Sequence, residues 1–273
     1  MNVNLLPMHA DIGVGGIHVR MRTDNREFLD MIQARYADFL SEVDRPDCEF
    51  EVQLCEPGAA SPDADDVEVY RDGESWCLRR GDFHAEWNPA ASRGWIRQSP
   101  NPYSLDSVLR IVHTLVLAHE GGMLMHASSA VRNGRAYLFA GVSGAGKTTI
   151  SRLAPANVHL LTDEMSFLRR ENGAYFAYGT PFYGDLGRPG ENLRAPLAGI
   201  FLLTQAPENR IDTLSRTEAV RGLMRNILFF AQDRELTQAV FASAVDLAER
   251  VSVRRLAFMP DARVWDLIGK ERS

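Results

Sequence analysis

One segment, Gly141 to Thr148, constrains this chain more than any other. It reads Gly-Val-Ser-Gly-Ala-Gly-Lys-Thr and satisfies GxxxxGK[ST], the pattern of a phosphate-binding loop. Glycines let such a loop wrap so that successive backbone N–H groups point at phosphate oxygens, and the helix that follows turns its positive dipole end toward them. The alternative is a glycine-rich turn that only opens a helix, but a chance match in a chain of this composition is on the order of one in a thousand.

The side chains that end the loop predict its ligand. Lys147 is expected to bridge the β- and γ-phosphates of ATP as a compact positive charge, and the Thr148 hydroxyl is expected to bind Mg²⁺. Lys147 and Lys270 are the lysines of the chain, so nearly all of its other positive charge is arginine. The predicted nucleotide-binding residues are Gly141, Ser143, Gly144, Ala145, Gly146, Lys147, Thr148 and Thr149.

Length and charge set the outer limits on the protein class. With 273 residues and 45% apolar content the chain can bury a substantial core, and we expect two domains, residues 1–122 and 123–273. A net charge of −6, with no basic run interleaved with aromatic residues, argues against nucleic acid as a partner. The sequence has no secretory signal pattern and no apolar run near the ~20 residues of a membrane span, so we expect a cytoplasmic protein with no membrane partner.

The first domain is predicted to be a small α+β unit that could help to recognise a substrate and that holds no catalytic residues. An Asp72-Gly73 pair between two short apolar runs is a strong hairpin signal. Its three cysteines, Cys48, Cys55 and Cys77, show no metal-site spacing and are expected to be buried thiols. The predicted elements are strands at 17–22, 50–54, 67–70 and 76–79, an exposed loop at 56–66, and amphipathic helices at 25–43 and 103–119.

The second domain is predicted to be a mixed α/β sheet built around the loop. The strand at 136–140 ends directly in the loop, and an Asn133-Gly134 turn joins it to the strand before it. Ser215 and Glu218 form a capping-box pattern, and Asp233 can cap another helix. The predicted strands are 123–131, 136–140, 158–162, 166–169, 174–178, 199–203, 210–214 and 251–258; the predicted helices are 148–153, 216–230, 234–250 and one begun by Asp261.

Two adjacent acids follow the strand at 158–162. Phosphoryl transfer to a hydroxyl needs one carboxylate to hold the metal and another to orient or deprotonate the acceptor, and Asp163 with Glu164 could supply both. Neighbours on a regular strand point to opposite faces, so both can reach one site only if the strand has ended. The alternative is one buried metal carboxylate beside one solvated acid.

Two further features are candidates for the same chemistry. His126 lies in a strand expected to run antiparallel to the one entering the loop; its ring could tune the catalytic carboxylate, or it could be an ordinary core histidine. The glycine- and proline-rich segment 180–190 suits a mobile loop over the phosphates, with Arg188 or Arg194 neutralising charge in the transition state. A bland surface loop is the alternative.

Taken together, His126, GVSGAGKTT and the LLTDE that follows resemble the C-terminal catalytic domain of HPr kinase/phosphorylase and its relatives, which include the peptide-tailoring kinases of lasso-peptide clusters. The resemblance covers roughly residues 123–214. It implies that Asp163 acts on an acceptor serine with His126 beside it, that Glu164 and Thr148 attend the metal, and that the protein forms oligomers. Here Glu164 stands where the best-known members carry a second aspartate.

The loop also resembles that of ATP-dependent phosphoenolpyruvate carboxykinase, which implies a second active-site lysine. Lys270, near the C-terminus, is the other lysine, so decarboxylation chemistry is not expected. We therefore expect a P-loop kinase domain of the HPr kinase/PEP carboxykinase type, with Asp163, His126 and Lys147 catalytic. The expected acceptor is a serine hydroxyl of a peptide or protein; the alternatives are a small-molecule alcohol, a nucleotide-hydrolysing switch, or a degenerate member of the family.

Overall fold

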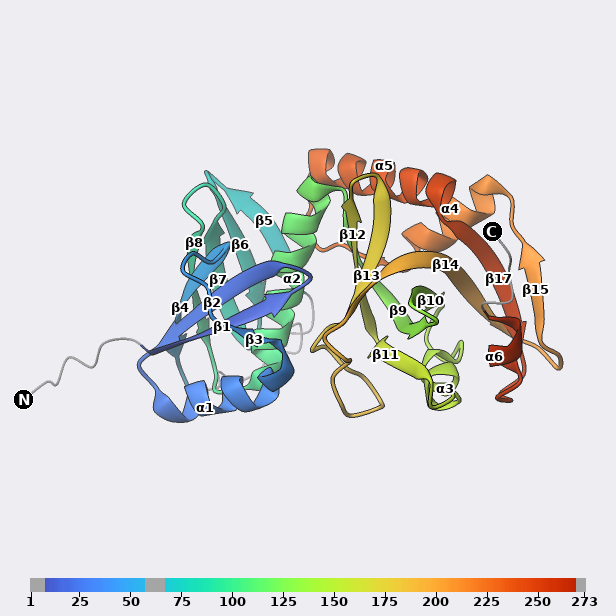
Figure 1. Ribbon diagram of the computed structural model, residues 1–273. Helices are drawn as coiled ribbons and strands as arrows, with labels where there is room; N and C mark the ends of the chain where they lie inside the picture. Colours follow the sequence, from blue (N-terminus) through green and yellow to red (C-terminus); the bar gives the residue numbers. More distant parts are fainter. Residues whose placement is uncertain (1–7, 57–66, 269–273) are drawn as a thin grey trace, which may run out of the picture. The chain divides into compact units, whose positions relative to one another are not determined.

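The computed structural model describes residues 8–56 and 67–268 and shows a mixed α/β protein (Figure 1). The described residues divide into two compact units: one runs to Leu115 and includes Phe229–Thr237, and the other comprises Val116–Leu228 and the residues from Gln238 on. The division falls inside helix α2 (Pro102–Glu120), whereas the sequence pattern placed it at Gly122. Lys270 and most of the predicted loop at 56–66 lie outside the described residues.

The first unit is built on an eight-stranded sheet in the order β3-β1-β2-β4-β8-β7-β6-β5. In β2, Ile17, Val19 and Met21 are buried and alternate with partly exposed residues, the period of a strand with one face on a core. Strands β1, β3, β7 and β8 were not predicted. The strands are β1 (Met8–Val14), β2 (Ile17–Thr23), β3 (Leu40–Ser41), β4 (Cys48–Leu54), β5 (Glu68–Asp72), β6 (Ser75–Arg80), β7 (Phe83–Asn88) and β8 (Arg93–Gln98).

Helix α1 (Arg26–Arg35) is shorter than the predicted helix at 25–43. Asn25 caps it by accepting a hydrogen bond from the Phe28 N–H at 2.8 Å. The helix ends at Arg35 with Tyr36 as its C-cap, and the short 3-10 turn η1 (Ala37–Phe39) leads into β3. The spacing of Tyr36 and Phe39 suits the 3-10 turn as well as a helix, and both are fully buried, so the apolar pattern alone did not reveal where the helix stops.

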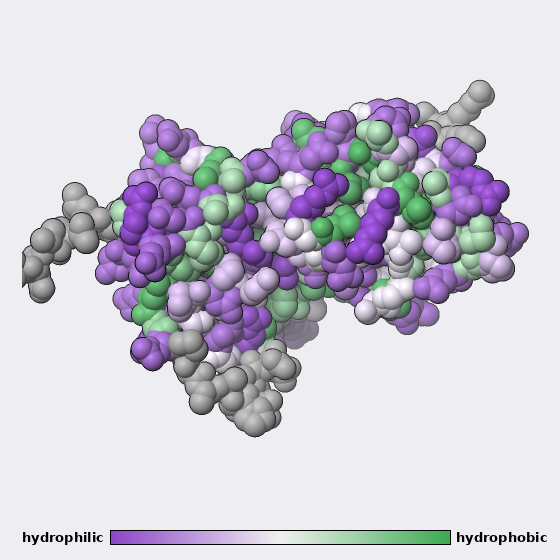
Figure 2. Space-filling model, turned by 90° about the horizontal axis from the view of Figure 1, so that it is seen from below, coloured by the Kyte–Doolittle hydropathy of each residue, from purple (hydrophilic) through white to green (hydrophobic). Residues whose placement is uncertain are grey.

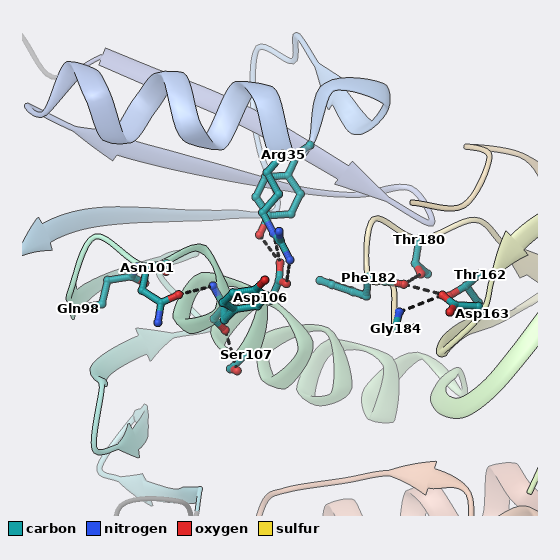
Figure 3. Close-up of polar contacts among 12 residues, drawn as sticks. Arg35, Gln98, Asn101, Asp106, Ser107, Thr162, Asp163, Thr180, Phe182 and Gly184 are labelled. Carbon is teal, nitrogen blue, oxygen red and sulfur yellow. Dashed lines mark hydrogen bonds and ion pairs between the residues drawn. The ribbon is translucent and has the colours of Figure 1, made fainter. Parts of the chain in front are cut away.

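A buried polar cluster ties α1 to the part of α2 that belongs to the first unit (Figure 3). The Arg35 guanidinium pairs with the Asp106 carboxylate, and the Tyr36 hydroxyl donates to the same carboxylate at 2.6 Å. Burial, with the Asp106 charge next to it, raises the pKa of Tyr36 well above its usual value. Because each member of this cluster has a partner, it can be buried without leaving a bare charge in the core.

The second unit contains a nine-stranded sheet in which five strands pair in a closed circuit. β10 pairs with β9 and β14, and β12 and β13 complete the circuit between those two. β14 is parallel to β10 and β17, and the remaining pairs are antiparallel. The strands are β9 (Met123–Arg132), β10 (Arg135–Ala140), β11 (Val158–Thr162), β12 (Met165–Glu171), β13 (Ala174–Tyr178), β14 (Arg194–Gln205), β15 (Arg210–Thr213), β16 (Ile227–Leu228) and β17 (Ser252–Phe258).

Alternate residues of β10 enter two different apolar cores. Ala136, Leu138 and Ala140 join a core that α4 (Arg216–Met224) and α5 (Arg234–Arg250) cover. Tyr137 and Phe139 join the other core, covered by α3 (Lys147–Arg152) and α6 (Val264–Leu267) (Figure 1). Because both faces of β10 are buried, the strand that leads into the glycine loop has little freedom to move.

The caps of α4 and α5 follow the sequence. Ser215 and Glu218 form the predicted capping box at the start of α4, and the Asp233 carboxylate accepts from the Leu236 N–H at 2.8 Å before α5. The prediction that α4 reaches Phe230 is wrong, because the helix ends at Met224 and the chain then adds β16 to the edge of β9. Local periodicity does not show this pairing with a distant strand.

The thiols are free, as expected. Cys48 and Cys77 are buried, and burial raises the pKa of Cys48 to about 12, whereas Cys55 is partly exposed. On the face shown in Figure 2, apolar residues form small patches separated by hydrophilic ones. None of the helices in the described parts of the chain is long and apolar enough to cross a membrane.

Candidate active site

The glycine loop between β10 and α3 adopts backbone angles that favour glycine. Gly144 has φ 77° and Gly146 has φ 106°. The loop is braced by the Gln205 side chain, whose Nε2 donates to the Gly144 carbonyl at 2.7 Å, and by the Ala145 N–H, which donates to the Val142 carbonyl at 3.1 Å. These contacts hold the loop open in a shape that suits close approach of phosphate oxygens to the backbone.

Among the glycines of the loop, Gly146 is the one where a side chain would be least tolerated. A Cβ there would lie 2.5 Å from the Phe258 ring, whereas a Cβ at Gly144 would have nothing within 4 Å. We therefore expect Gly146→Ala to cost more than the roughly 1–2 kcal/mol of positive φ alone, and to weaken nucleotide binding at least about tenfold. Thermal unfolding and calorimetric titration, with Gly144→Ala as the matched control, check this; equal losses in the two variants would contradict the role given to the Phe258 ring.

Lys147 begins α3 with its side chain inside the loop. Its ammonium donates to the carbonyls of Gly141 at 2.9 Å and Val142 at 3.3 Å. Burial lowers the pKa of Lys147, and the nearby Glu164 charge opposes that effect. The Lys147 carbonyl accepts a hydrogen bond from the Ser151 hydroxyl at 3.0 Å. Lys147 is therefore held to the loop by its side chain and to α3 by its backbone.

The strand β11 ends where the two acids begin. The Thr162 hydroxyl accepts from the N–H groups of Glu164 and Met165, both at 3.1 Å, and donates to the Phe182 carbonyl at 3.0 Å. These bonds turn the chain between β11 and β12, so Asp163 and Glu164 are not constrained to opposite faces of a strand. The condition for both acids to reach one site is met.

The Asp163 carboxylate is buried and held by the segment that follows Phe182 (Figure 3). Its Oδ1 accepts from the Gly184 N–H and its Oδ2 from the Leu186 N–H, each at 3.0 Å. A Cβ on Gly184 would lie 3.4 Å from Asp163 Oδ2. Backbone amides therefore fix both oxygens of this carboxylate, which is the kind of orientation that a catalytic acid or base needs.

His126 lies on β9 beside the turn that carries the acids. β11 pairs with the second half of β9 and β12 with the first, so the turn between them runs along β9 near His126. The His126 backbone is opposite Met165, and the neighbouring Ala127 N–H donates to the Glu164 carbonyl at 2.9 Å. The imidazole is partly exposed.

These groups surround one pocket of about 290 Å³. Gly141 and Ala145 are buried in the loop and do not line it, whereas the other predicted nucleotide-binding residues, His126 and the two acids do. Three lining residues, Arg152, Gly184 and Asp185, were not singled out as site residues. The lining residues are His126, Ser143, Gly144, Gly146, Lys147, Thr148, Thr149, Arg152, Asp163, Glu164, Gly184 and Asp185.

The two arginines suggested for the transition state lie elsewhere. Arg194 pairs with Glu171, donates to the Tyr178 hydroxyl at 3.1 Å and stacks over the Phe176 ring at 3.6 Å. Arg188 is exposed and does not line the pocket. The ends of the glycine-rich segment 180–190 are anchored, because the Thr180 hydroxyl donates to the Met165 carbonyl at 2.9 Å and the Gly190 N–H donates to the Thr180 carbonyl at 3.1 Å.

The donor set suits a nucleotide with Mg²⁺. In the described part of the chain no three His, Cys, Asp or Glu side chains converge on a metal site. Mg²⁺ with nucleotide phosphates needs only one or two protein oxygens beside phosphate and water. Thr148 and Glu164 line the same pocket and offer such oxygens.

The family model described as SynChlorMet cassette protein ScmC matches residues 100–271, which include the glycine loop, His126 and the two acids. No curated protein matches the chain.

Proposed function

The chain belongs to the family of SynChlorMet cassette proteins ScmC, and from the geometry of its pocket we propose that it is an ATP-dependent kinase that transfers the γ-phosphoryl group to a serine hydroxyl of a peptide or protein. One observation carries the proposal. The glycine loop with Lys147 and the fixed carboxylate of Asp163 line the same pocket, together with His126 and Glu164. Phosphoryl transfer needs phosphate binding, a metal oxygen ligand and an acceptor-side base in one place.

Each residue has a distinct part in the proposed reaction. The backbone of the loop and Lys147 bind the phosphates, and Thr148 and Glu164 offer oxygens to Mg²⁺. When bound by these residues, Mg²⁺ would neutralise part of the charge on the phosphates. Asp163, held by two backbone amides, orients the acceptor hydroxyl and accepts its proton as the oxygen attacks phosphorus. His126 lies beside the turn that carries Asp163 and Glu164, and its ring tunes the basicity of the Asp163 carboxylate.

The HPr kinase type of P-loop fold is part of the same proposal. It is supported by the order of the parts: β9 carries His126, β10 delivers the loop, and β11 delivers Asp163. The acceptor is the less constrained part. A serine side chain and a small alcohol present the same hydroxyl to Asp163, so a small-molecule alcohol is the competing acceptor.

Label transfer tests the proposal. The protein is incubated with Mg²⁺ and ATP labelled at the γ-phosphate, with the peptides encoded beside its gene as first acceptors and with a panel of small alcohols. We expect label on a peptide serine, located by mass spectrometry, and no transfer by Lys147→Ala. Label on an alcohol would replace the peptide acceptor. Label found only as free phosphate would instead indicate a nucleotide-hydrolysing switch.

A further inference from the structure

We propose that Arg152 is a further catalytic residue, whose guanidinium contacts the γ-phosphoryl group as it is transferred; this inference rests on the proposed kinase function. Arg152 ends α3 and lines the pocket that holds Lys147 and Asp163. The sequence pattern directed attention to Arg188 and Arg194, and neither lines that pocket.

The helix places Arg152 on the phosphate side of the pocket. Residues four apart on a helix share a face, so Arg152 follows Thr148, the predicted Mg²⁺ ligand, on α3. Both residues line the pocket, while Ile150 and Ser151 between them are buried against the core. The same geometry that presents the Thr148 hydroxyl to the phosphates therefore presents the Arg152 side chain one turn further along.

The charges around the pocket favour a role for a second cation. Asp163, Glu164 and Asp185 line it as acids, and the transferring group adds negative charge of its own. Lys147 is buried and tied to carbonyls inside the loop. Among the described residues that line the pocket, Arg152 is the one arginine, and a planar guanidinium can donate two parallel hydrogen bonds to phosphoryl oxygens.

Arg152 is also linked to the catalytic acid. Its Nη2 donates to the Asp185 carbonyl at 3.2 Å, and the residues on either side of Asp185 donate their N–H groups to Asp163. The bond to the carbonyl is long, exposed and uses one of five N–H donors, so a charged phosphoryl oxygen can replace it as the stronger acceptor. The guanidinium thus lies where the phosphate and acceptor sides of the pocket meet.

In the proposed step, the acceptor oxygen forms a bond to the γ-phosphorus as the bond from that phosphorus to the bridging oxygen of ADP breaks. The acceptor proton passes to Asp163, and Arg152 donates hydrogen bonds without giving up a proton. Because such contacts strengthen as charge shifts in the transition state, Arg152 acts on the rate more than on ground-state binding.

The test compares Arg152→Gln with Arg188→Gln, an exposed arginine outside the pocket. We expect Arg152→Gln to lower transfer by about 10³-fold or more, the range found for arginines that contact a transferring phosphoryl group, with MgADP affinity within about threefold of wild type. Binding of MgADP with aluminium fluoride, which imitates the transferring group, should be lost in Arg152→Gln and kept in Arg188→Gln.

Two results would overturn the role of Arg152: unchanged transfer by Arg152→Gln, or equal loss of MgADP and MgADP–aluminium fluoride binding. Should Arg152→Gln unfold early on heating, added guanidinium is tested with Arg152→Ala; recovered transfer supports the contact, and none argues against it. Failure of the kinase proposal is distinguishable, because the wild-type protein would then neither bind MgATP nor label an acceptor.

Discussion

Replacing Asp163 with asparagine is expected to lower phosphoryl transfer by about 10²–10⁴-fold, the range for loss of a general base, while nucleotide affinity stays within about threefold. Asparagine cannot accept the acceptor proton. The backbone N–H groups of Gly184 and Leu186 donate to the Asp163 carboxylate. The NH₂ group of asparagine would face one of these donors and could not accept its hydrogen bond. In the proposed reaction the loop, not Asp163, binds the nucleotide phosphates, so binding and transfer should separate in this variant.

Calorimetric titration with MgATP and a label-transfer rate, measured on the same preparation, check this separation. Glu208→Gln is a suitable control, because it removes an acid from an exposed ion pair with Arg210 in the same unit. A thermal unfolding curve shows whether the asparagine disturbs the segment around Gly184. Full transfer activity in Asp163→Asn would remove Asp163 from the mechanism.

Lys147→Ala is expected to show the opposite pattern, with nucleotide affinity reduced by at least about 10²-fold and no measurable transfer. A hydrogen bond to a charged group contributes roughly 1.5–3 kcal/mol, and a tenfold change in affinity corresponds to about 1.4 kcal/mol, so two such contacts reach this range. The ammonium also holds the carbonyls of Gly141 and Val142, so its removal loosens the loop as well.

Titration of Lys147→Ala with MgATP gives the affinity directly. Lys147→Arg is the informative companion, because arginine keeps the charge but cannot reproduce the compact ammonium inside the loop. We expect intermediate affinity for it. Wild-type affinity in the alanine variant would show that the loop does not use this cation to bind phosphate.

The parts of the site that the sequence predicted are those defined by short-range chemistry. GxxxxGK[ST] needs a strand before it and a helix after it, and both are present as β10 and α3. The Asp163-Glu164 pair follows β11 directly. Because the strand ends there, the two acids are not held on opposite faces of it. Capping residues such as Ser215 and Asp233 act within three residues and were equally visible.

What the sequence did not show depends on contacts between distant segments. Strand β1 breaks the apolar alternation with Asp11, which is buried because Arg20 on β2 pairs with it at 2.7 Å. In β8, Gly94 weakens the sequence signal for a strand. Glycine is needed there because a Cβ would lie 2.3 Å from the Glu86 carbonyl oxygen of the adjacent strand β7. The hydrogen bond from the Gly184 N–H to Asp163 joins residues 21 positions apart, so no local sequence pattern predicts it. Arg152 could have been found, since it is four residues after Thr148 on the predicted helix.

The proposed function requires that the loop from Gly141 to Thr148 holds the polyphosphate of a nucleotide next to Asp163. Calorimetric titration of the intact protein with Mg²⁺ and a non-hydrolysable ATP analogue tests it most directly. We expect one molecule bound per chain, with a dissociation constant between about 1 μM and 1 mM, the usual range for enzyme substrates. No heat of binding up to several times the top of that range would contradict the claim.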